Sequence, residues 1–211
     1  MKPAKTPRPR NAAATREAIL ASARQAFALS GYDGAGVREI AAGAGVTAML
    51  VNRYFGSKEQ LFAEVVAASM ADPTILTPQV LNAPNAGEAI AAALVGITRT
   101  GATPLEGFQI MLHSASSAPA ARIARDEIGK HHHATMTAAL TGELAPQRAA
   151  LVLAIVAGLQ VMRQMIALPA LADTDPQVLI KLLAPLFQQL LDGDPTGTAD
   201  EREPPRAPAL P

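Results

Sequence analysis

The stretch "GVREIAAGAGVTAMLVNRYFGSKEQLF", Gly36–Phe62, decides the fold of this 211-residue chain and holds three of its seven aromatic residues. Apolar residues recur at helical spacing on both sides of the turn "GAGV", which predicts a short helix from about Val37 to Ala44. Thr47 is placed to cap a further helix that runs to about Tyr54. The stretch therefore predicts two short helices that meet at a glycine-containing turn.

The residues on either side of this stretch complete a helical module. A helix of about sixteen residues is expected before it, because Asn11 or Thr15 can cap that helix and Ser30-Gly31 can end it. Ser57 opens a capping box of the form S-x-x-Q, which predicts a fourth helix that ends before Asp72-Pro73. Three helices followed by a connecting helix are therefore predicted for the first third of the chain.

The helix from Thr47 to Tyr54 has two different faces. On a helical wheel, Val51 and Phe55 fall on one face, whereas Asn52 and Arg53 fall on the other. A small helical module has little area to bury, so its large aromatic side chains are expected to form its core. The residues between the aromatics are therefore the candidates for function.

Residues 15–66 resemble the N-terminal DNA-binding domain of the TetR family of bacterial transcriptional regulators, through the pattern I-A-x-x-A-G-V and the junction Y-F-x-S-K-E-x-L. The resemblance implies an all-α fold, with an N-terminal three-helix helix-turn-helix DNA-binding domain and a C-terminal helical ligand-binding and dimerisation domain. It also implies that the helix from Thr47 to Tyr54 enters the major groove of DNA, and that Tyr54 and Lys58 contact phosphates.

Two positions depart from the family pattern. Gly36 stands where Ser or Thr usually caps the second helix, and this change weakens the cap and a phosphate contact. Asn52 stands where Tyr is commoner, and this change alters the expected base preference.

The side chains of this module have chemistry that suits DNA. Asn can bond adenine through two hydrogen bonds, Arg can bond guanine, and Ala or Met can contact a thymine methyl group. Lys58 lies in the first turn of a helix, where the macrodipole disfavours a cation unless a phosphate binds there; a solvated lysine is the alternative. For Arg38 the alternative to a phosphate contact is an ion pair near Glu39. The candidate DNA-binding residues are Arg38, Thr47, Ala48, Met49, Asn52, Arg53, Tyr54 and Lys58.

The charge of the chain is unevenly distributed, although its formal net charge is zero. Residues 1–60 carry nine Lys and Arg against four Asp and Glu, whereas residues 61–211 carry nine against fourteen. A basic front end predicts a polyanionic partner. Four of the positive charges lie in the Pro-rich segment 1–10, so a solvated tail is the alternative interpretation.

Composition excludes several classes of protein. An apolar content of 49% excludes a disordered polymer, and the absence of cysteine excludes disulfides, thiolate metal sites and cysteine nucleophiles. The basic N-terminus "MKPAKTPRPR" lacks the apolar segment of a secretory signal, so we expect a cytoplasmic protein. The residues suggest no set of nucleophile, base and orienting group, and we expect neither an enzyme nor a bound cofactor.

The rest of the chain is rich in Ala and Leu and is predicted to be helical. We expect helices at about 86–100, 104–116, 118–141, 146–168 and 176–191, which makes about nine in all. The expected organisation is a basic flexible arm (1–10), a helix-turn-helix DNA-binding domain (11–56), a connecting helix (57–71), a helical ligand-binding and dimerisation domain (72–192) and a disordered tail (193–211).

The apolar segment 149–171 has the length of a membrane span. Gln160, Arg163 and Gln164 lie at its centre, so we expect no membrane span. Outside this polar stripe the helix is apolar on all sides, and a two-fold mate can cover it. The family's dimer is made by the last two helices, so a homodimer is expected here. Pro185 is expected to kink the last helix.

Six residues are candidates for a small-molecule site between the C-terminal helices: Phe108, Met111, His113, Gln160, Arg163 and Gln164. The alternative for His113 is a core histidine, and the alternative for Arg163 is a carboxylate partner across the dimer. The tract His131–His133 resembles a metal-binding tract. Because consecutive residues of a helix project roughly 100° apart, their rings cannot converge on one ion, and no metal site is expected.

The predicted function is that of a ligand-responsive, sequence-specific transcriptional repressor. It would leave a pseudo-palindromic double-stranded DNA operator when a small hydrophobic effector binds. The alternative is a helical small-molecule binding or carrier protein whose DNA-binding module is vestigial. Sequence-selective DNA binding that weakens with salt distinguishes the two.

Overall fold

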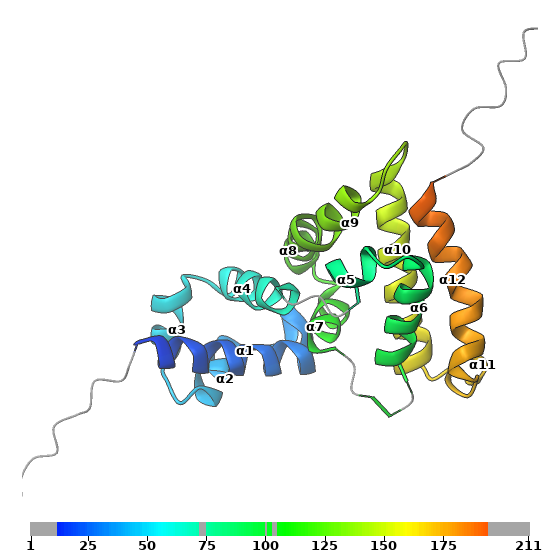
Figure 1. Cartoon of the computed structure of the whole chain (residues 1–211). Helices are drawn as coiled ribbons and strands as arrows, with labels where there is room; N and C mark the ends of the chain where they lie inside the picture. Colours follow the sequence, from blue (N-terminus) through cyan, green and yellow to red (C-terminus); the bar gives the residue numbers. More distant parts are fainter. Residues whose placement is uncertain (1–11, 72–74, 100, 103–104, 194–211) are drawn as a thin grey trace, which may run out of the picture.

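In the computed structural model, the described residues 12–71, 75–99, 101–102 and 105–193 fold into helices and contain no strand (Figure 1). The helices are α1 (Ala12–Gly34), α2 (Val37–Gly43), α3 (Ala48–Phe55), α4 (Lys58–Met70), α5 (Pro78–Leu81), α6 (Ala86–Ile97), α7 (Glu106–Ser114), α8 (Ala118–Ile128), α9 (Ala134–Ala139), α10 (Ala145–Leu159), α11 (Pro169–Ala172) and α12 (Pro176–Asp192), with π-helical segments η1 (Gly129–His133) and η2 (Gln160–Met165). The all-α fold class is confirmed.

Several expectations fall outside the described residues. These are the Asn11 cap, the arm 1–10, the stop at Asp72-Pro73, the start at Pro104 and the tail from 194 to 211. They stay predictions from the sequence.

Side-chain caps start the two helices that follow the glycine turn. Thr47 Oγ1 accepts a hydrogen bond from the Leu50 backbone at 3.3 Å, and Ser57 Oγ accepts one from the Gln60 backbone at 3.1 Å. Each bond satisfies one of the donors that a helix N-terminus leaves free. At Gly36 no side chain can do this, and α2 begins without a side-chain cap, in agreement with the departure noted in the sequence.

A glycine interrupts the first helix at the point where α7 packs against it. Gly31 has φ +65 and interrupts the helical backbone of α1, which continues for one more turn to Gly34. The expected length of about sixteen residues was too short, because the regular helix already begins at Ala12. A Cβ atom at Gly31 would overlap the carbonyl group of His113 in α7. Glycine therefore permits both the backbone turn and the close approach of α7 to α1.

One core joins the N-terminal helices to α7 and α8. Phe27 and Phe62 are fully buried, and their rings meet edge to face with centroids 5.0 Å apart. Ile110 of α7 and Ala120 of α8 are buried in the same cluster. The aromatic residues of the opening stretch thus serve mainly as core, and that core extends into the second half of the chain.

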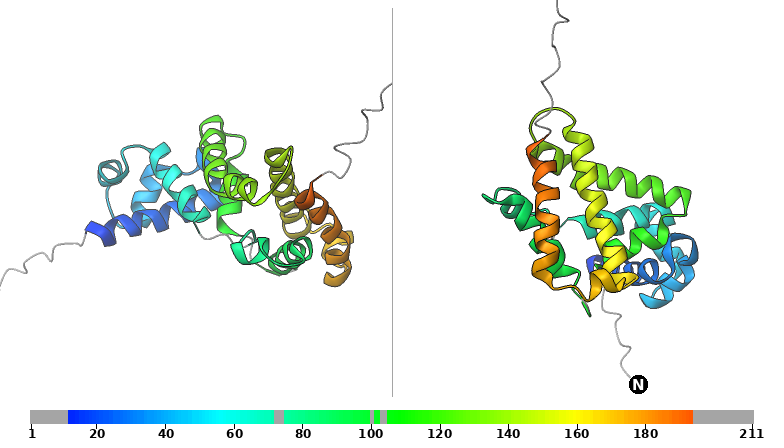
Figure 2. Two further views of the ribbon diagram at one scale, coloured as in Figure 1. Left: turned by 45° about the horizontal axis from the view of Figure 1, so that its top comes forward. Right: turned by 90° about the vertical axis from the view of Figure 1, so that its right-hand side faces the viewer.

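A second core joins the C-terminal helices. Helix α6 packs against α12, and α10 runs beside α12 (Figure 2). Leu94, Val152 and Phe187 are fully buried between them. Helix α12 continues through Pro185, whose ring removes one backbone donor from the helix.

Each of the long helices expected at 118–141 and 146–168 contains a π-helical segment. Segment η1 separates α8 from α9, and η2 follows α10 directly. The single turns α5 and α11 add to the count, so the described residues hold more helical segments than the nine expected. Short π-helical segments recur at functional sites.

The run Ala145–Met165, which is α10 with η2, is long and apolar enough to cross a membrane by length and composition alone. It also carries two arginines, Arg148 and Arg163, which are 7% and 3% exposed. Arg148 donates to the Leu190 carbonyl of α12 at 3.0 Å, and Arg163 donates to the Val95 carbonyl of α6 at 2.8 Å. These bonds make the run part of the helical core described above.

Candidate functional site

Helix α3 buries one face and exposes the other. Val51 and Phe55 are 2% and 4% exposed and belong to the N-terminal core. Asn52 and Arg53 are exposed, and Met49 is 79% exposed. The structure confirms the two faces that the helical wheel predicted, with polar and flexible side chains directed away from the core.

The turn between α2 and α3 presents this helix at one end of the molecule. Gly45 adopts φ +66, a conformation that favours glycine, and the Val46 amide donates to the Ala41 carbonyl at 2.9 Å. Ser22 Oγ donates to the Ile40 carbonyl at 2.8 Å and ties α2 to α1. Helices α2 and α3 lie at the opposite end of the molecule from α10 and α12 (Figure 1).

Lys58 is held at the start of α4 by an aromatic ring. Its Nζ lies 4.6 Å from the centroid of the Tyr32 ring, a distance that allows a cation–π interaction. Burial raises the pKa of Tyr32, so this side chain stays a neutral phenol at neutral pH. The ammonium group is thus positioned without an ion-pair partner among the described residues, next to the N-terminus of α4.

The other predicted DNA-binding residues divide into two groups. Arg38 is exposed, and in the described part of the chain it forms no ion pair with Glu39. Ala48 and Tyr54 are half-buried and pack against the core, whereas the Thr47 hydroxyl is engaged in its cap. Of the predicted charged and amide side chains, Arg38, Asn52 and Arg53 are exposed, and Lys58 is half-buried beside Tyr32.

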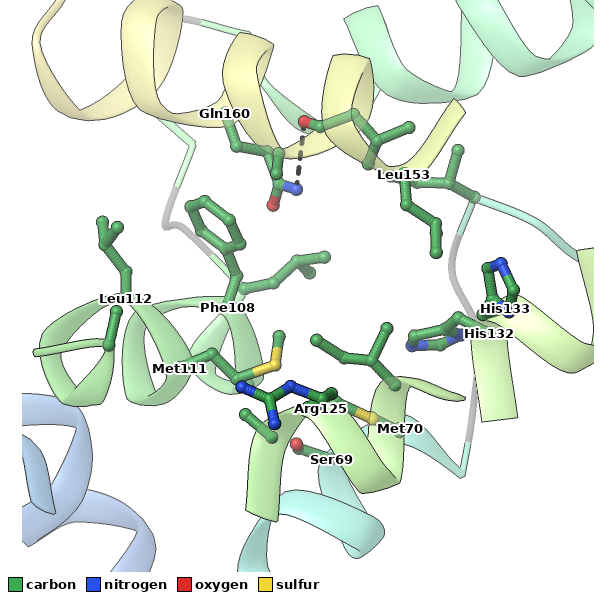
Figure 3. A pocket seen from close by; sticks show the side chains of 18 of the residues that line it. Ser69, Met70, Phe108, Met111, Leu112, Arg125, His132, His133, Leu153 and Gln160 are labelled. Atoms are coloured by element: carbon green, nitrogen blue, oxygen red, sulfur yellow. Dashed lines mark hydrogen bonds between the residues drawn. The ribbon is translucent and has the colours of Figure 1, made fainter. Parts of the chain in front are cut away.

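A cavity of about 1010 Å³ lies between α4, α7, α8, η1 and α10 (Figure 3). Its volume is at the upper end of the range of roughly 300–1,000 Å³ for sites that bind drug-sized molecules. Most of the wall is apolar, with large contributions from Met70, Phe108, Met111, Ile128, Leu153 and Val156. Polar and charged side chains are few: Arg24, Ser69, Glu106, Arg125, His132, His133 and Gln160.

Three of the six predicted ligand-site residues line this cavity, and three do not. Phe108 and Met111 come from α7, and Gln160 comes from the end of α10. Arg163 and Gln164 point elsewhere, toward the end of α6. His113 faces α1, where its Nδ1 lies 2.6 Å from the Ala28 carbonyl oxygen.

The two polar residues after Gln160 close the C-terminus of α6. Arg163 donates to the Val95 carbonyl at 2.8 Å and to Thr98 Oγ1 at 3.0 Å. Gln164 Nε2 donates to the Ile97 carbonyl, the last of α6, at 3.3 Å, and to the Ala102 carbonyl beyond it at 2.9 Å. The last carbonyls of a helix lack partners within that helix, so these donors satisfy buried acceptors. Burial lowers the pKa of Arg163 from its ordinary value. Arg163 has no carboxylate partner within the described chain.

Gln160, in the cavity wall, has a buried side-chain oxygen without a hydrogen-bond donor among the described residues. The residue is 4% exposed, and its Nε2 donates to the Val156 carbonyl at 3.3 Å. A carbonyl oxygen only accepts, so the amide must turn its nitrogen toward Val156, which leaves its buried Oε1 on the side of Phe108, another residue of the cavity wall (Figure 3). Among the residues that the structure describes, Oε1 finds no hydrogen-bond partner.

The histidine tract contributes to the cavity through η1. His132 and His133 both line the wall, whereas His131 pairs with Glu127 at 3.3 Å. Desolvation by burial, and secondarily the neighbouring His131, lower the pKa of His132. His133 Nε2 lies 2.8 Å from the Pro146 carbonyl oxygen. The described residues contain no group of three His, Cys, Asp or Glu that could hold a metal ion.

Sequence reasoning missed most of the polar residues of the cavity. Arg125 and His132 line it from α8 and η1, and Ser69 lines it from the end of α4. Helical periodicity places each of them on a face of its own helix. It does not show which faces of four helices meet around one space.

Two family models match the chain. The model described as "Bacterial regulatory proteins, tetR family" matches residues 19–65, and the model described as "Tetracyclin repressor-like, C-terminal domain" matches residues 84–191. The chain belongs to the TetR family of transcriptional regulators. The resemblance seen in the sequence is thereby confirmed, and α2 and α3 form the helix-turn-helix of a DNA-binding regulator.

Solved TetR-family structures resemble this chain. A TetR-family regulator from Streptomyces coelicolor A3 is 25% identical, over 88% of this chain and 98% of that chain, at a TM-score of 0.50. The multidrug binding protein EbrR, complexed with imidazole, is 20% identical over 93% and 100% of the two chains, at 0.61. The fatty acid degradation regulator FadR from Bacillus halodurans is 18% identical over 84% and 98%, at 0.59. The last two likenesses show the fold alone. A comparison with curated proteins gave no significant match.

In this TetR-family chain, α7 connects the cavity to the N-terminal helices. The Tyr32 amide of α1 donates to Ser114 Oγ of α7 at 2.9 Å, and beyond the end of α7 Ser117 Oγ, just before α8, donates to Asp33 Oδ1 of α1 at 3.0 Å. A Cβ at Gly107 would overlap Ser69, so α7 also lies close to α4. The helix that supplies Phe108 and Met111 to the cavity is therefore bonded to α1 and packed on α4.

The TetR-family chain also leaves an apolar surface on its last two long helices, α10 and α12, which lie side by side in Figure 2. Large apolar side chains are exposed on α10, on the η2 segment that continues it and on α12: Leu151 (53%), Met162 (38%), Val178 (49%), Leu182 (62%) and Leu186 (49%). The three residues on α12 recur every four positions, so they share one face of that helix. We call this set the α10/α12 face.

Proposed function

We propose that the protein is a ligand-responsive, sequence-specific transcriptional repressor that leaves its operator when a small hydrophobic effector binds. The observation that carries this proposal is the link from the cavity to α1 and α4, the helices that flank the helix-turn-helix. The cavity wall helix α7 is bonded to α1, and α4 joins the cavity at Ser69 to the DNA-facing end at Lys58. The protein would act in the cytoplasm, where chromosomal DNA is found in bacteria.

The exposed face of α3 supplies the proposed base contacts. Asn52 and Arg53 have the side chains that bond adenine and guanine edges, and Met49 can contact a thymine methyl group. Thr47 and Ala48 lie in the first turn of α3, within reach of bases. Arg38, Tyr54 and Lys58 would contact phosphates, which position the domain without reading sequence. We propose residues 11–56 as the DNA-binding domain, 57–71 as the connecting helix and 72–192 as the effector and dimerisation domain.

The α10/α12 face supports a homodimer. Exposed apolar side chains on two adjacent helices are typical of a protein interface. A two-fold axis through this face would bring the same residues of two copies together. The two α3 helices would then read half-sites about one DNA turn (roughly 34–36 Å) or a multiple of it apart, so the operator would be pseudo-palindromic.

Effector release follows from linkage. An effector that binds the arrangement unable to engage DNA more tightly than the DNA-binding arrangement shifts the population toward release. A difference of about 1–3 kcal/mol in effector binding changes operator affinity by about five- to 150-fold. The cavity lies against α4 and α7, so a molecule inside it would act directly on the helices that position α3.

Selection of bound sequences from a pool of random DNA duplexes tests the proposal. A pseudo-palindromic motif with half-sites about one helical turn apart is expected, with affinity that falls steeply as salt rises. The apolar cavity alone would also suit a carrier of small apolar molecules. A carrier would enrich no motif and would show at most weak, sequence-independent association with DNA, and that result would overturn the repressor proposal.

A further inference from the structure

Gln160 Oε1 is a hydrogen-bond acceptor without a donor among the described residues, and a bound ligand could supply that donor. A buried acceptor without a partner is unfavourable, and most buried polar atoms have one. A buried water needs about two to four polar partners. The labelled side chains beside Gln160 in Figure 3, Phe108 and Leu153, are apolar, so water would gain little there. A ligand with a hydroxyl or N–H group at this point would satisfy Oε1.

The opposite wall of the cavity is positively charged. Arg125 on α8 lies across the cavity from Gln160 (Figure 3), and Arg24 on α1 lines the same space. Within the described residues neither arginine has an ion-pair partner. The one carboxylate among the lining residues is that of Glu106, so the lining carries two arginines against one carboxylate.

Ser69 and His132 leave the excess of positive charge in the cavity lining unchanged. Ser69 Oγ donates to the Val66 carbonyl at 2.7 Å, so its proton is already used. His132 is mostly neutral at neutral pH, because burial lowers its pKa. Arg125 and Arg24 are therefore the groups that would meet a charged part of a ligand.

We infer that the cavity binds an amphipathic anion, an elongated apolar molecule with an acidic group at the Arg125 wall and a hydrogen-bond donor at Gln160. This inference rests on the proposed function in treating the cavity as the effector site. It adds the chemical class of the effector. A carboxylate accepts charge-assisted hydrogen bonds from guanidinium groups, and a hydroxyl at the far end of the molecule donates to Oε1.

Four twelve-carbon probes test this class on the purified full-length chain, below the concentrations at which they form micelles. They are ω-hydroxydodecanoate, dodecanoate, dodecanol and dodecylammonium, and calorimetry measures their binding. ω-Hydroxydodecanoate should bind more tightly than dodecanoate by about fivefold, the value of one added hydrogen bond. Both acids should bind more tightly than dodecylammonium by about tenfold or more, because the cation meets Arg125 and Arg24.

Two variants assign each preference to its residue. In Gln160→Met, which keeps the side-chain length, the hydroxy acid should bind more weakly than dodecanoate, because its hydroxyl would be buried without an acceptor. In Arg125→Gln, both acids should lose about three- to tenfold in affinity, while dodecanol should be unaffected. Arg99→Gln is the matched control, because Arg99 is an exposed arginine outside the cavity lining.

The comparisons among the probes test the Gln160 contact and the anionic group separately. Equal or tighter binding of dodecanoate over the hydroxy acid in the unmodified protein overturns the role of Gln160. Equal binding of dodecylammonium and dodecanoate overturns the anionic class. If none of the four probes binds, the whole inference fails. Operator binding by the same preparation is measured separately, so that failure stays distinct from a failure of the proposed repressor function.

Discussion

Arg122 on α8 forms an ion pair with Glu59 on α4, with 3.4 Å between Nη2 and Oε2. Glu59 lies in the first turn of α4, next to Lys58. The side chains are 59% and 51% exposed, so the pair contributes little to stability, about 0.2–1 kcal/mol. The pair is of interest because it connects α8 to the first turn of α4. Arg125, one turn further along α8, lines the cavity, so one helix contacts both the cavity and the start of α4.

The first prediction concerns this contact. Arg122→Glu should lower the free energy of unfolding by less than about 1 kcal/mol, because the pair is solvent-exposed. It should change the ratio of operator affinities measured with and without effector, because it replaces an attraction between α8 and α4 with a repulsion. Combining it with Glu59→Arg should restore the ratio. An unchanged ratio in Arg122→Glu would show that α8 does not transmit the effector signal through Glu59.

The second prediction separates base contacts from phosphate contacts on the DNA-facing surface. Asn52→Ala or Arg53→Ala should relax the base preference and weaken operator binding by about 1–3 kcal/mol if either makes a bidentate contact. Lys58→Ala should weaken binding to all sequences and make the slope of log affinity against log salt shallower by about one unit. Competition assays against shuffled duplexes measure both effects. A change of base preference in Lys58→Ala alone would reverse these roles.

Local features of the sequence predicted the N-terminal structure well. The caps at Thr47 and Ser57, the turn at Gly45 and the two faces of α3 depend on residues within one or two helical turns, and each is found in the structure. The Tyr32 ring beneath Lys58 could not be predicted, because the two residues come from different helices.

Long-range features of the C-terminal half were harder to predict. Of the three polar-stripe residues predicted for a ligand site, Gln160 lines the cavity, whereas Arg163 and Gln164 donate to carbonyls at the end of α6. A wheel shows that a polar stripe exists on one helix. It cannot show whether a cavity, a second subunit or the carbonyls of a neighbouring helix will receive it.

The third prediction revises the role of Arg163. Arg163→Met should lower the free energy of unfolding by about 2–4 kcal/mol, because the carbonyl oxygens of Val95 and Leu171 and the Thr98 hydroxyl all lose their donor. Urea denaturation measures this change. Arg99→Met, at an exposed arginine near the same end of α6, should change stability by no more than about 0.5 kcal/mol. Equal effects of the two substitutions would mean that the buried bonds of Arg163 contribute nothing.

The fourth prediction is a pH dependence that arises from His132. Its pKa in the folded chain is lowered by burial, so the unfolded chain binds more protons as pH falls through the ordinary histidine value of about 6.5. Stability should therefore rise with pH across that window and fall on acidification. His132→Gln should flatten this part of the curve, and His131, Arg125 and His133 remain as the neighbouring charged or titratable groups. Unfolding in urea at a series of pH values measures the slope, and an identical slope in the variant would contradict the assignment.

The last prediction concerns assembly through the α10/α12 face. Leu182 is 62% exposed in the single chain, so Leu182→Glu should leave the fold of one subunit intact. Because a two-fold interface contains every substituted residue twice, the change would bury two carboxylates and raise the dimer dissociation constant by at least about tenfold. Sedimentation velocity at micromolar concentration measures the dimer fraction. Leu29→Glu is the matched control, because Leu29 is 79% exposed on α1 and lies outside this face. Operator affinity should fall in Leu182→Glu, since two linked half-site contacts become independent, and should be retained in Leu29→Glu. An unmodified chain that sediments as a monomer, or a Leu182→Glu chain that dimerises as tightly as the control, would show that the two copies do not meet through α10 and α12.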